Sequence, residues 1–423
     1  MNPIKRQFFF SFTVMGSVLP YLPVFLAHRG LSMQEIGAVM SVTGLGIMAS
    51  PVLTTLLADW RVQSRTLLTA VFAVSAASLA WLAGARGFGL LMLAHGAFAI
   101  AFAPATALQD GLYFQRAAEL RQAATRAASP HPAVVPAYHS IRVFGTLGFI
   151  LPSLLLYGLL WWGIDTTAAI LCAAACALAG LLNTFTLPRV KQNDSGQGQR
   201  PAPRTALPTV AAARAMLEPR VLVFCFALLL LHLAITAYYS FYPVYLTQTV
   251  DIPARWIGLI STLGVVIEIG FILGFGVMLR WWGLRRLMAF GALCMAARFG
   301  LLGLVPTPSL AVGTQAFHGI MVAVVHVAPP IYLNHRARDA FRSSIQGLFA
   351  MAVMGTGRIA GNLIGGAVAQ TSLTAVFLYA AVLALFATAL FAFAFHDRLD
   401  DLAEPKLQPD RLPSDQILSA PTK

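Results

Sequence analysis

The strongest constraint on the fold is a series of apolar stretches, each about 20 residues long, that recurs along the whole chain. Segments of about this length match the hydrocarbon core of a bilayer. A backbone without water around it must satisfy its hydrogen bonds internally, so these segments are predicted to be transmembrane helices. Twelve spans are expected, near residues 7–28, 34–58, 66–85, 88–112, 138–161, 164–187, 220–246, 255–279, 284–305, 309–333, 342–368 and 371–395.

The composition agrees with a membrane protein. The chain is 58% apolar and only 11% charged, well below the share of about 25% that a soluble domain carries. The net charge of +13 lies in short loops between apolar stretches, so we expect a lipid bilayer around the chain and no nucleic-acid partner. The four cysteines form no CxxC pair, which argues against a metal site. The chain lacks the nucleophile-elbow, phosphate-loop and HExxH motifs, so neither an enzyme nor a cofactor is expected.

A polar linker near residues 188–219 divides the expected spans into two groups of six. Residues 1–187 are predicted to form one half and residues 220–395 the other, and residues 396–423 a disordered tail. Lysines and arginines of the loops fall mostly on one side of the membrane, and only Arg29, Arg86 and Arg255 fall on the other. Because the positive side faces the cytoplasm, both termini are predicted to be cytoplasmic, in the cytoplasmic membrane.

The two predicted halves repeat one another in sequence. The segment Pro23–Leu26 is echoed by Pro243–Leu246, an offset of 220 residues, and His95 by His318, an offset of 223 residues. Two parallel six-helix halves with a substrate site between them resemble the plan of the major facilitator superfamily. This resemblance implies an all-α membrane fold with twelve transmembrane helices.

The loops after the second and eighth spans resemble the gating-loop motif of major facilitators. The first copy keeps Asp59 and Arg65 but lacks the glycines, whereas the second keeps Gly276 and Gly283 but lacks the acid. The resemblance implies that these residues gate the conformational change. Ordinary positively charged cytoplasmic loops would give a similar pattern, so that alternative stays open.

The fifth span begins with a charged residue inside an apolar stretch. Residues Ser140–Phe149 read S-I-R-V-F-G-T-L-G-F and resemble a signature of proton-linked nucleoside symporters and phenylpropionate permeases. Nucleoside symporters use the matching arginine, threonine and phenylalanine around their substrate, so the resemblance implies that Arg142, Thr146 and Phe149 contact the substrate. Arg142 lies near the start of its span, and its long side chain could instead reach the lipid headgroups.

Glu268 is the most deeply placed acid. It lies about 12 residues from either end of its span, roughly 18 Å along the helix axis, and its short side chain cannot reach the surface. Arg298 in the neighbouring antiparallel span is expected at a similar depth. We expect these two to form an ion pair, with Glu268 as a proton carrier and Arg298 near the substrate. A purely structural ion pair is the alternative.

Further polar residues complete the predicted site. His318 and His326 are eight residues apart and fall on one face of a helix, where they could relay protons. Asp110 is a second candidate proton carrier, which would pair with Arg142 or cap its own helix end. Tyr239 is expected to line the substrate cavity, although helix packing would explain it equally well. The segments around Tyr239, Glu268 and the two histidines resemble the phenylpropionate-permease branch most.

These observations favour a monomeric secondary transporter that uses the proton gradient as its energy source. The expected solute is a small aromatic or organic acid, because a guanidinium presents a fork of donors to a carboxylate. A nucleoside or sugar proton symporter is the alternative, and an exporter by proton antiport is a third. From a different class, the chain could be a membrane sensor or scaffold that transports nothing.

Overall fold

The computed structural model describes residues 1–59, 63–126, 136, 138–188, 208–337 and 342–396. Within these residues every regular element is a helix. The first expected half contains α1 (Asn2–Val18), α2 (Leu22–His28), α3 (Met33–Asp59), α4 (Ser64–Gly84), α5 (Phe88–Phe102), α6 (Ala105–Arg126), α7 (Tyr138–Trp161) and α8 (Thr167–Thr184). Residues 60–62, 189–207 and 397–423, which include most of the expected linker and the expected tail, lie outside the described part.

The described residues from 208 onward contain two long helices, α10 and α11, and several shorter ones. They are α9 (Pro208–Met216), α10 (Pro219–Gln248), α11 (Ile257–Leu304), α12 (Pro308–Gly313), α13 (His318–Val322), α14 (Ala328–Arg336), α15 (Arg342–Phe349), α16 (Thr356–Ala369) and α17 (Leu373–Ala389). The helix α9 falls inside the stretch that was expected to be linker. Two π-helical turns, η4 (Ala323–Val327) and η6 (Ala350–Gly355), follow α13 and precede α16.

Nine helices in the described part are long and apolar enough to cross a membrane, or ten if the bent pair α1–α2 forms one span. This count is lower than the expected twelve partly because α11 covers two expected spans. Gly283 divides α11, with a φ of 70° that lies outside the helical region and favours glycine. The predicted break between 279 and 284 therefore exists as a kink.

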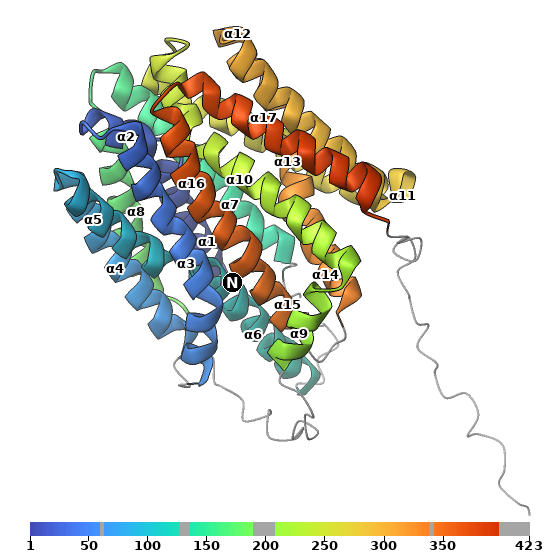
Figure 1. Cartoon of the computed structure of the whole chain (residues 1–423). Coiled ribbons are helices and arrows are strands. Elements are labelled where there is room, and N and C mark those ends of the chain that lie inside the picture. The colour runs from blue at the N-terminus through green and yellow to red at the C-terminus, as the bar shows by residue number, and fades with distance from the viewer. Residues whose placement is uncertain (60–62, 127–135, 137, 189–207, 338–341, 397–423) are drawn as a thin grey trace, which may run out of the picture.

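The helices form two groups with separate buried cores. One core is built mostly from residues 4–187 and the other mostly from residues 221–395. In Figure 1 the helices α4, α5 and α8 lie on one side of the bundle, and α11, α13 and α17 on the other. The helix α16 contacts α3, and α7 contacts α11, so these pairs join the two groups.

Several close contacts join the two groups at one end of the bundle. The backbone N–H of Gly258 donates to the Tyr21 hydroxyl at 3.2 Å, and the Thr262 hydroxyl donates to the Ser153 hydroxyl at 3.1 Å. Close to the start of α3, Gly37 lies against the backbone of Gly366, where an added Cβ would come within 2.9 Å of the Gly366 Cα. The two groups are therefore held together at the end that contains the start of α3 and the start of α11.

Glycines also set the close approach of α1 and α7 within one group. A Cβ on Gly148 would meet the backbone of Phe9, and a Cβ on Gly16 would meet the backbone of Phe149. Small residues at a membrane helix contact let the two backbones come together, so that van der Waals packing replaces the missing hydrophobic drive. The helix α7, which carries Arg142, is thereby fixed against α1.

We expect Gly148→Ala to destabilise the protein by about 1–3 kcal/mol, because the added methyl group overpacks this contact. Gly158→Ala is the matched control, since Gly158 lies on the same helix and a Cβ there meets nothing within 4 Å. The measurement is thermal unfolding of the purified variants in detergent. Equal unfolding temperatures for the two variants would contradict the close contact between α1 and α7.

Candidate functional site

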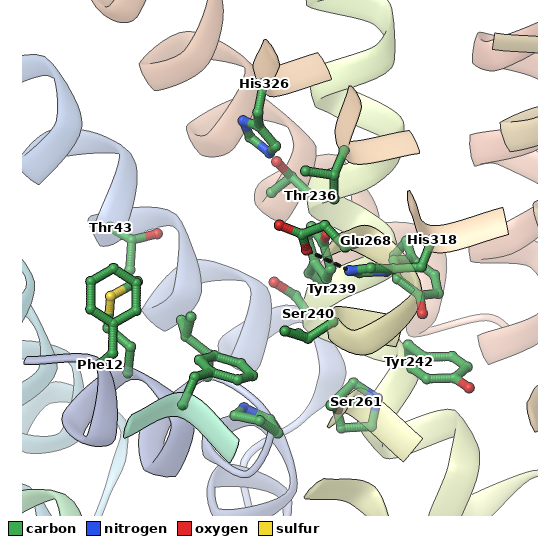
Figure 2. Close-up of a pocket in the computed structure, with 18 of the residues that line it drawn as sticks. Phe12, Thr43, Thr236, Tyr239, Ser240, Tyr242, Ser261, Glu268, His318 and His326 are labelled. Atoms are coloured by element: carbon green, nitrogen blue, oxygen red, sulfur yellow. Dashed lines mark ion pairs between the residues drawn. The ribbon is translucent and has the colours of Figure 1, made fainter. Parts of the chain in front are cut away.

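A cavity of about 330 Å³ lies between the two groups of helices. Its walls come from α1, α3 and α7 on one side and from α10, α11, α13, η4 and α16 on the other. Figure 2 shows Phe12 and Thr43 on one side of this space and Glu268, Tyr239 and His326 on the other. The volume lies at the small end of the range of about 300–1,000 Å³ that is typical of ligand pockets.

The predicted substrate contacts on α7 all line this cavity. Arg142, Thr146 and Phe149 follow the spacing i, i+4 and i+7, which puts them on one face of a helix. The Arg142 guanidinium lies over the Phe12 ring, 4.0 Å from the ring centroid. The cation–π contact holds this side chain at the cavity wall.

Glu268 and His318 form a pair at the cavity wall of the second group. The His318 Nε2 lies 3.6 Å from the Glu268 Oε2, as the dashed line in Figure 2 marks. On the other side of the ring, the His318 Nδ1 lies 3.4 Å from an Arg298 nitrogen. A guanidinium can only donate, so Nδ1 acts as the acceptor and the ring hydrogen sits on Nε2, facing Glu268.

Arg298 differs from the prediction. Its side chain is fully buried, it does not line the cavity, and no ion pair joins it to Glu268 in the described part of the chain. Instead it donates to the Tyr238 hydroxyl and, at 3.0 Å, to the Gln315 Oε1. The expected charge pair is therefore replaced by a chain in which His318 stands between the guanidinium and the carboxylate.

Asp110 also lies outside the cavity lining. Its Oδ1 accepts a hydrogen bond of 2.7 Å from the Tyr138 hydroxyl, and both residues interact electrostatically with Arg142. The expected association between Asp110 and Arg142 is thus present as an electrostatic interaction next to Tyr138. Asp110 has no contact with the space in which a solute would sit.

The helices α10, η4 and α16 supply two further predicted site residues. They also supply Arg358, to which the sequence assigned no role. Tyr239, His326 and Arg358 all line the cavity. Arg358 is followed one helical turn later by Asn362, which also lines the cavity and accepts a hydrogen bond of 2.5 Å from the Ser240 hydroxyl. Arg358 therefore belongs to the candidate site.

Several cavity residues escaped the sequence analysis because they are uncharged. They are mostly small polar or aromatic side chains within apolar stretches and include Phe12, Thr43, Thr236, Ser240, Ser261, Gln315 and Asn362. A useful signal would have been the two amides, Gln315 and Asn362, because an amide inside a membrane span needs partners. Gln315 indeed donates to the Tyr242 hydroxyl at 3.0 Å.

The predicted gating-loop residues lie away from this cavity. Arg65 donates to the carbonyl oxygens of Phe185 and Leu187, at 2.8 and 3.2 Å, and so ties the start of α4 to the end of α8. Gly283 forms the kink in α11, and Gly276 lies in open space within the same helix. The side chain of Asp59 lies outside the described part, and the gating role of all four residues stays a prediction.

Comparison with known proteins identifies a family and several relatives of this chain. Residues 2–380 match the MFS_1 like family. The chain is 25% identical to the putative nucleoside transporter YegT of Escherichia coli K12 over 86% of this chain and 83% of that protein. It is 22% identical to the xanthosine permease of the same organism, over 93% and 95% of the two chains.

A third relative and a solved structure extend the comparison. The chain is 26% identical to the probable 3-phenylpropionic acid transporter of Escherichia coli K12, over 88% of each chain. Its fold superposes on the crystal structure of the nucleoside transporter NupG with a TM-score of 0.78 at 20% identity, covering 94% of this chain and 99% of that one. These relatives are membrane transporters and not enzymes. The chain therefore belongs to the MFS_1 like family, within the branch of the major facilitator superfamily that includes nucleoside and phenylpropionate transporters.

Proposed function

We propose that the protein is a monomeric secondary transporter that carries a nucleoside together with a proton across the cytoplasmic membrane. The carrying observation is the cavity between the two groups of helices, which combines aromatic walls with hydrogen-bonding side chains and an acid. Two relatives support a nucleoside, since their names state nucleoside and xanthosine transport. The nucleoside, an alternative in the sequence analysis, thus takes precedence over the aromatic acid.

An aromatic acid remains the second candidate because the cavity carries the two cationic side chains Arg142 and Arg358. A relative named as a probable 3-phenylpropionic acid transporter also supports it. The two candidates share a flat ring, which Phe12, Phe149 and Tyr239 would contact at the cavity wall. They differ in charge, and that difference separates them by experiment.

The proposed mechanism is alternating access of two six-helix halves, residues 1–187 and 220–395. Twelve spans result if α1–α2 and α5–α6 each count as one span, α11 as two, the interrupted helices between Pro308 and Ala369 as two, and the short α9 as none. The contacts of Tyr21 with Gly258 and of Ser153 with Thr262 then lie at the external end and hold it shut. Transport requires these contacts to separate while new ones form at the cytoplasmic end.

The function is tested by uptake into proteoliposomes that contain the purified protein. Labelled uridine, xanthosine and 3-phenylpropionate are offered with and without an inwardly directed proton gradient. Accumulation of a nucleoside above its external concentration, only when the gradient is present, is the expected result. Accumulation of 3-phenylpropionate alone would favour the second candidate, and no movement of any solute would contradict transport of this class.

The orientation proposal places both termini in the cytoplasm, because most loop lysines and arginines would then lie inside. A reporter that is active only in the cytoplasm should be active when fused after Lys423. The same reporter inserted next to Asp165, in the loop between α7 and α8, should be inactive. Activity at Asp165 and none at Lys423 would reverse the orientation, and the same result at both sites would change the number of spans between them.

The coupling proposal assigns the transported proton to Glu268. His318 presents its ring hydrogen to this carboxylate and is held in that tautomer by Arg298, so Glu268 is the acid that can take up a proton at the cavity wall. We expect Glu268→Gln to abolish uphill uptake driven by a proton gradient while exchange of solute across the membrane continues, since exchange moves no net proton. Proton-driven accumulation at the parental level in this variant would remove Glu268 from the coupling mechanism.

A matched control for this variant is Glu35→Gln. Glu35 is also an acid on a membrane helix, but it lies at the start of α3 and accepts hydrogen bonds from Ser32. Its replacement removes the same charge without touching the cavity. Proton-driven uptake by Glu35→Gln should therefore stay close to that of the parent protein.

A further inference from the structure

The charges around the cavity are not equally balanced. Arg142 interacts electrostatically with Asp110, and Arg298 faces Glu268 through the His318 ring. Arg358 lines the same cavity, and among the ion pairs of the described residues none involves it. Glu268, the acid in the cavity lining, is paired with His318, so Arg358 has no ion-pair partner among the described residues.

The neighbouring helices cannot supply that acid from within the membrane. The helix α16 packs against α3, α10 and α17, and the sequences of α10, α16 and α17 contain no aspartate or glutamate. In α3 the acids stand only near its two ends, where Glu35 is bonded to Ser32 and the side chain of Asp59 lies outside the described part. A charge in this position needs a partner, a watery cavity or a ligand.

The described side chains that interact with Arg358 include no carboxylate. Arg358 interacts electrostatically with Tyr239, His232 and His326. Gly357 lets α16 approach α10 at this level, because a Cβ there would lie 2.6 Å from the His232 Cβ. The His232 and His326 rings lie 5.8 Å apart, and the buried His232 Nε2 has no hydrogen-bond partner among the described residues.

The backbone around this cluster is irregular on both contributing segments. His326 lies in the π-helical turn η4, and the π-helical turn η6 ends three residues before Arg358. Single π-helical turns inside α-helices occur frequently at functional sites, since the extra residue re-aims the side chains that follow. Both turns lie close to α10, which carries His232 and Tyr239.

We propose that Arg358, with Tyr239 and His326, forms an oxyanion subsite of the transport cavity. It takes a carboxylate or phosphate group carried by the aromatic solute, which the guanidinium fork can bind through two parallel hydrogen bonds. The proposal rests on the proposed transport function and makes it more specific. It predicts that an acidic member of a solute series binds better than its neutral counterpart.

The experiment measures binding by calorimetry to the purified protein, using matched pairs of probes. Uridine is compared with uridine 5′-carboxylate and uridine 5′-monophosphate, and 3-phenylpropanamide with 3-phenylpropionate. The acids should bind more tightly than their neutral partners, and the two uridine acids show whether carboxylate or phosphate is preferred. Equal affinities of the parent protein within each pair, including no measurable binding, would overturn the subsite.

The variants identify the residue that recognises the acid. Arg358→Gln should weaken binding of the preferred acid roughly 10- to 150-fold, as the loss of a charge-assisted hydrogen-bonded contact does, and leave the neutral partner nearly unchanged. Arg358→Lys keeps the charge without the planar fork. Its affinity for the preferred acid should lie between those of the parent protein and Arg358→Gln. Arg86→Gln, which removes the same charge from an exposed loop position, should not alter either affinity.

The two proposals fail in different ways. An equal loss of neutral and acidic ligands in Arg358→Gln, at unchanged unfolding temperature, would make Arg358 a structural residue and overturn the subsite. If Arg358→Gln does not fold, the same comparison is made with Arg358→Lys. Acid binding that depends on Arg358 without uptake into proteoliposomes would keep the subsite and refute transport. Uptake of uridine without any preference for acids would keep the transport function and refute the subsite.

Discussion

The interior of a bilayer cannot solvate a charge, and the arrangement of this site follows from how the charges within it are accommodated. Arg298 is the clearest case, because its guanidinium is fully buried and its partners are the Tyr238 hydroxyl, the Gln315 amide and a histidine ring nitrogen. Since a guanidinium never accepts, it dictates the hydrogen positions of all three partners. The state of His318, and through it the surroundings of Glu268, depend on a residue that touches no solute.

Glycines decide which parts of the molecule move as units. Within one half, Gly16 and Gly148 lock α1 to α7, and within the other Gly357, Gly361 and Gly365 press α16 onto α10. Across the halves, Gly37 meets α16 near Gly366. In the proposed alternating access, the contacts within each group keep the cavity walls together, whereas the contact between the groups opens. Glycines at helix contacts therefore stabilise each group and also close the contact between the groups, depending on which helices they join.

The sequence predicts how far along a helix each residue lies, but not the direction in which its side chain points from the helix axis. Depth follows from counting at about 1.5 Å per residue, and it placed Glu268 deep within its span, where this residue lines the cavity. The rotation of a helix about its axis depends on packing, which a uniformly apolar span does not encode. Arg298 consequently had the expected depth but the wrong partner, and Asp110 turned toward Tyr138 instead of the cavity. Small hydroxyl residues such as Thr43 and Ser240 gave no signal, since their role becomes visible only once a cavity faces them.

The unmatched charge of Arg358 bears on how transport couples to the membrane potential. A solute that carries one negative charge and travels with one proton adds no net charge to the cavity, so the loaded and empty carriers cross with the same charge. A neutral nucleoside with one proton would instead move one positive charge, which gains about 2.3 kcal/mol for every 100 mV of potential. With two guanidinium groups and one carboxylate in the wall, the empty cavity already carries excess positive charge while Glu268 is ionised. Adding a further proton without an anion would increase this excess inside a low-dielectric space, whereas an acidic solute offsets it. Within the proposed nucleoside class, the charge of the cavity wall therefore favours a member that carries an acidic group.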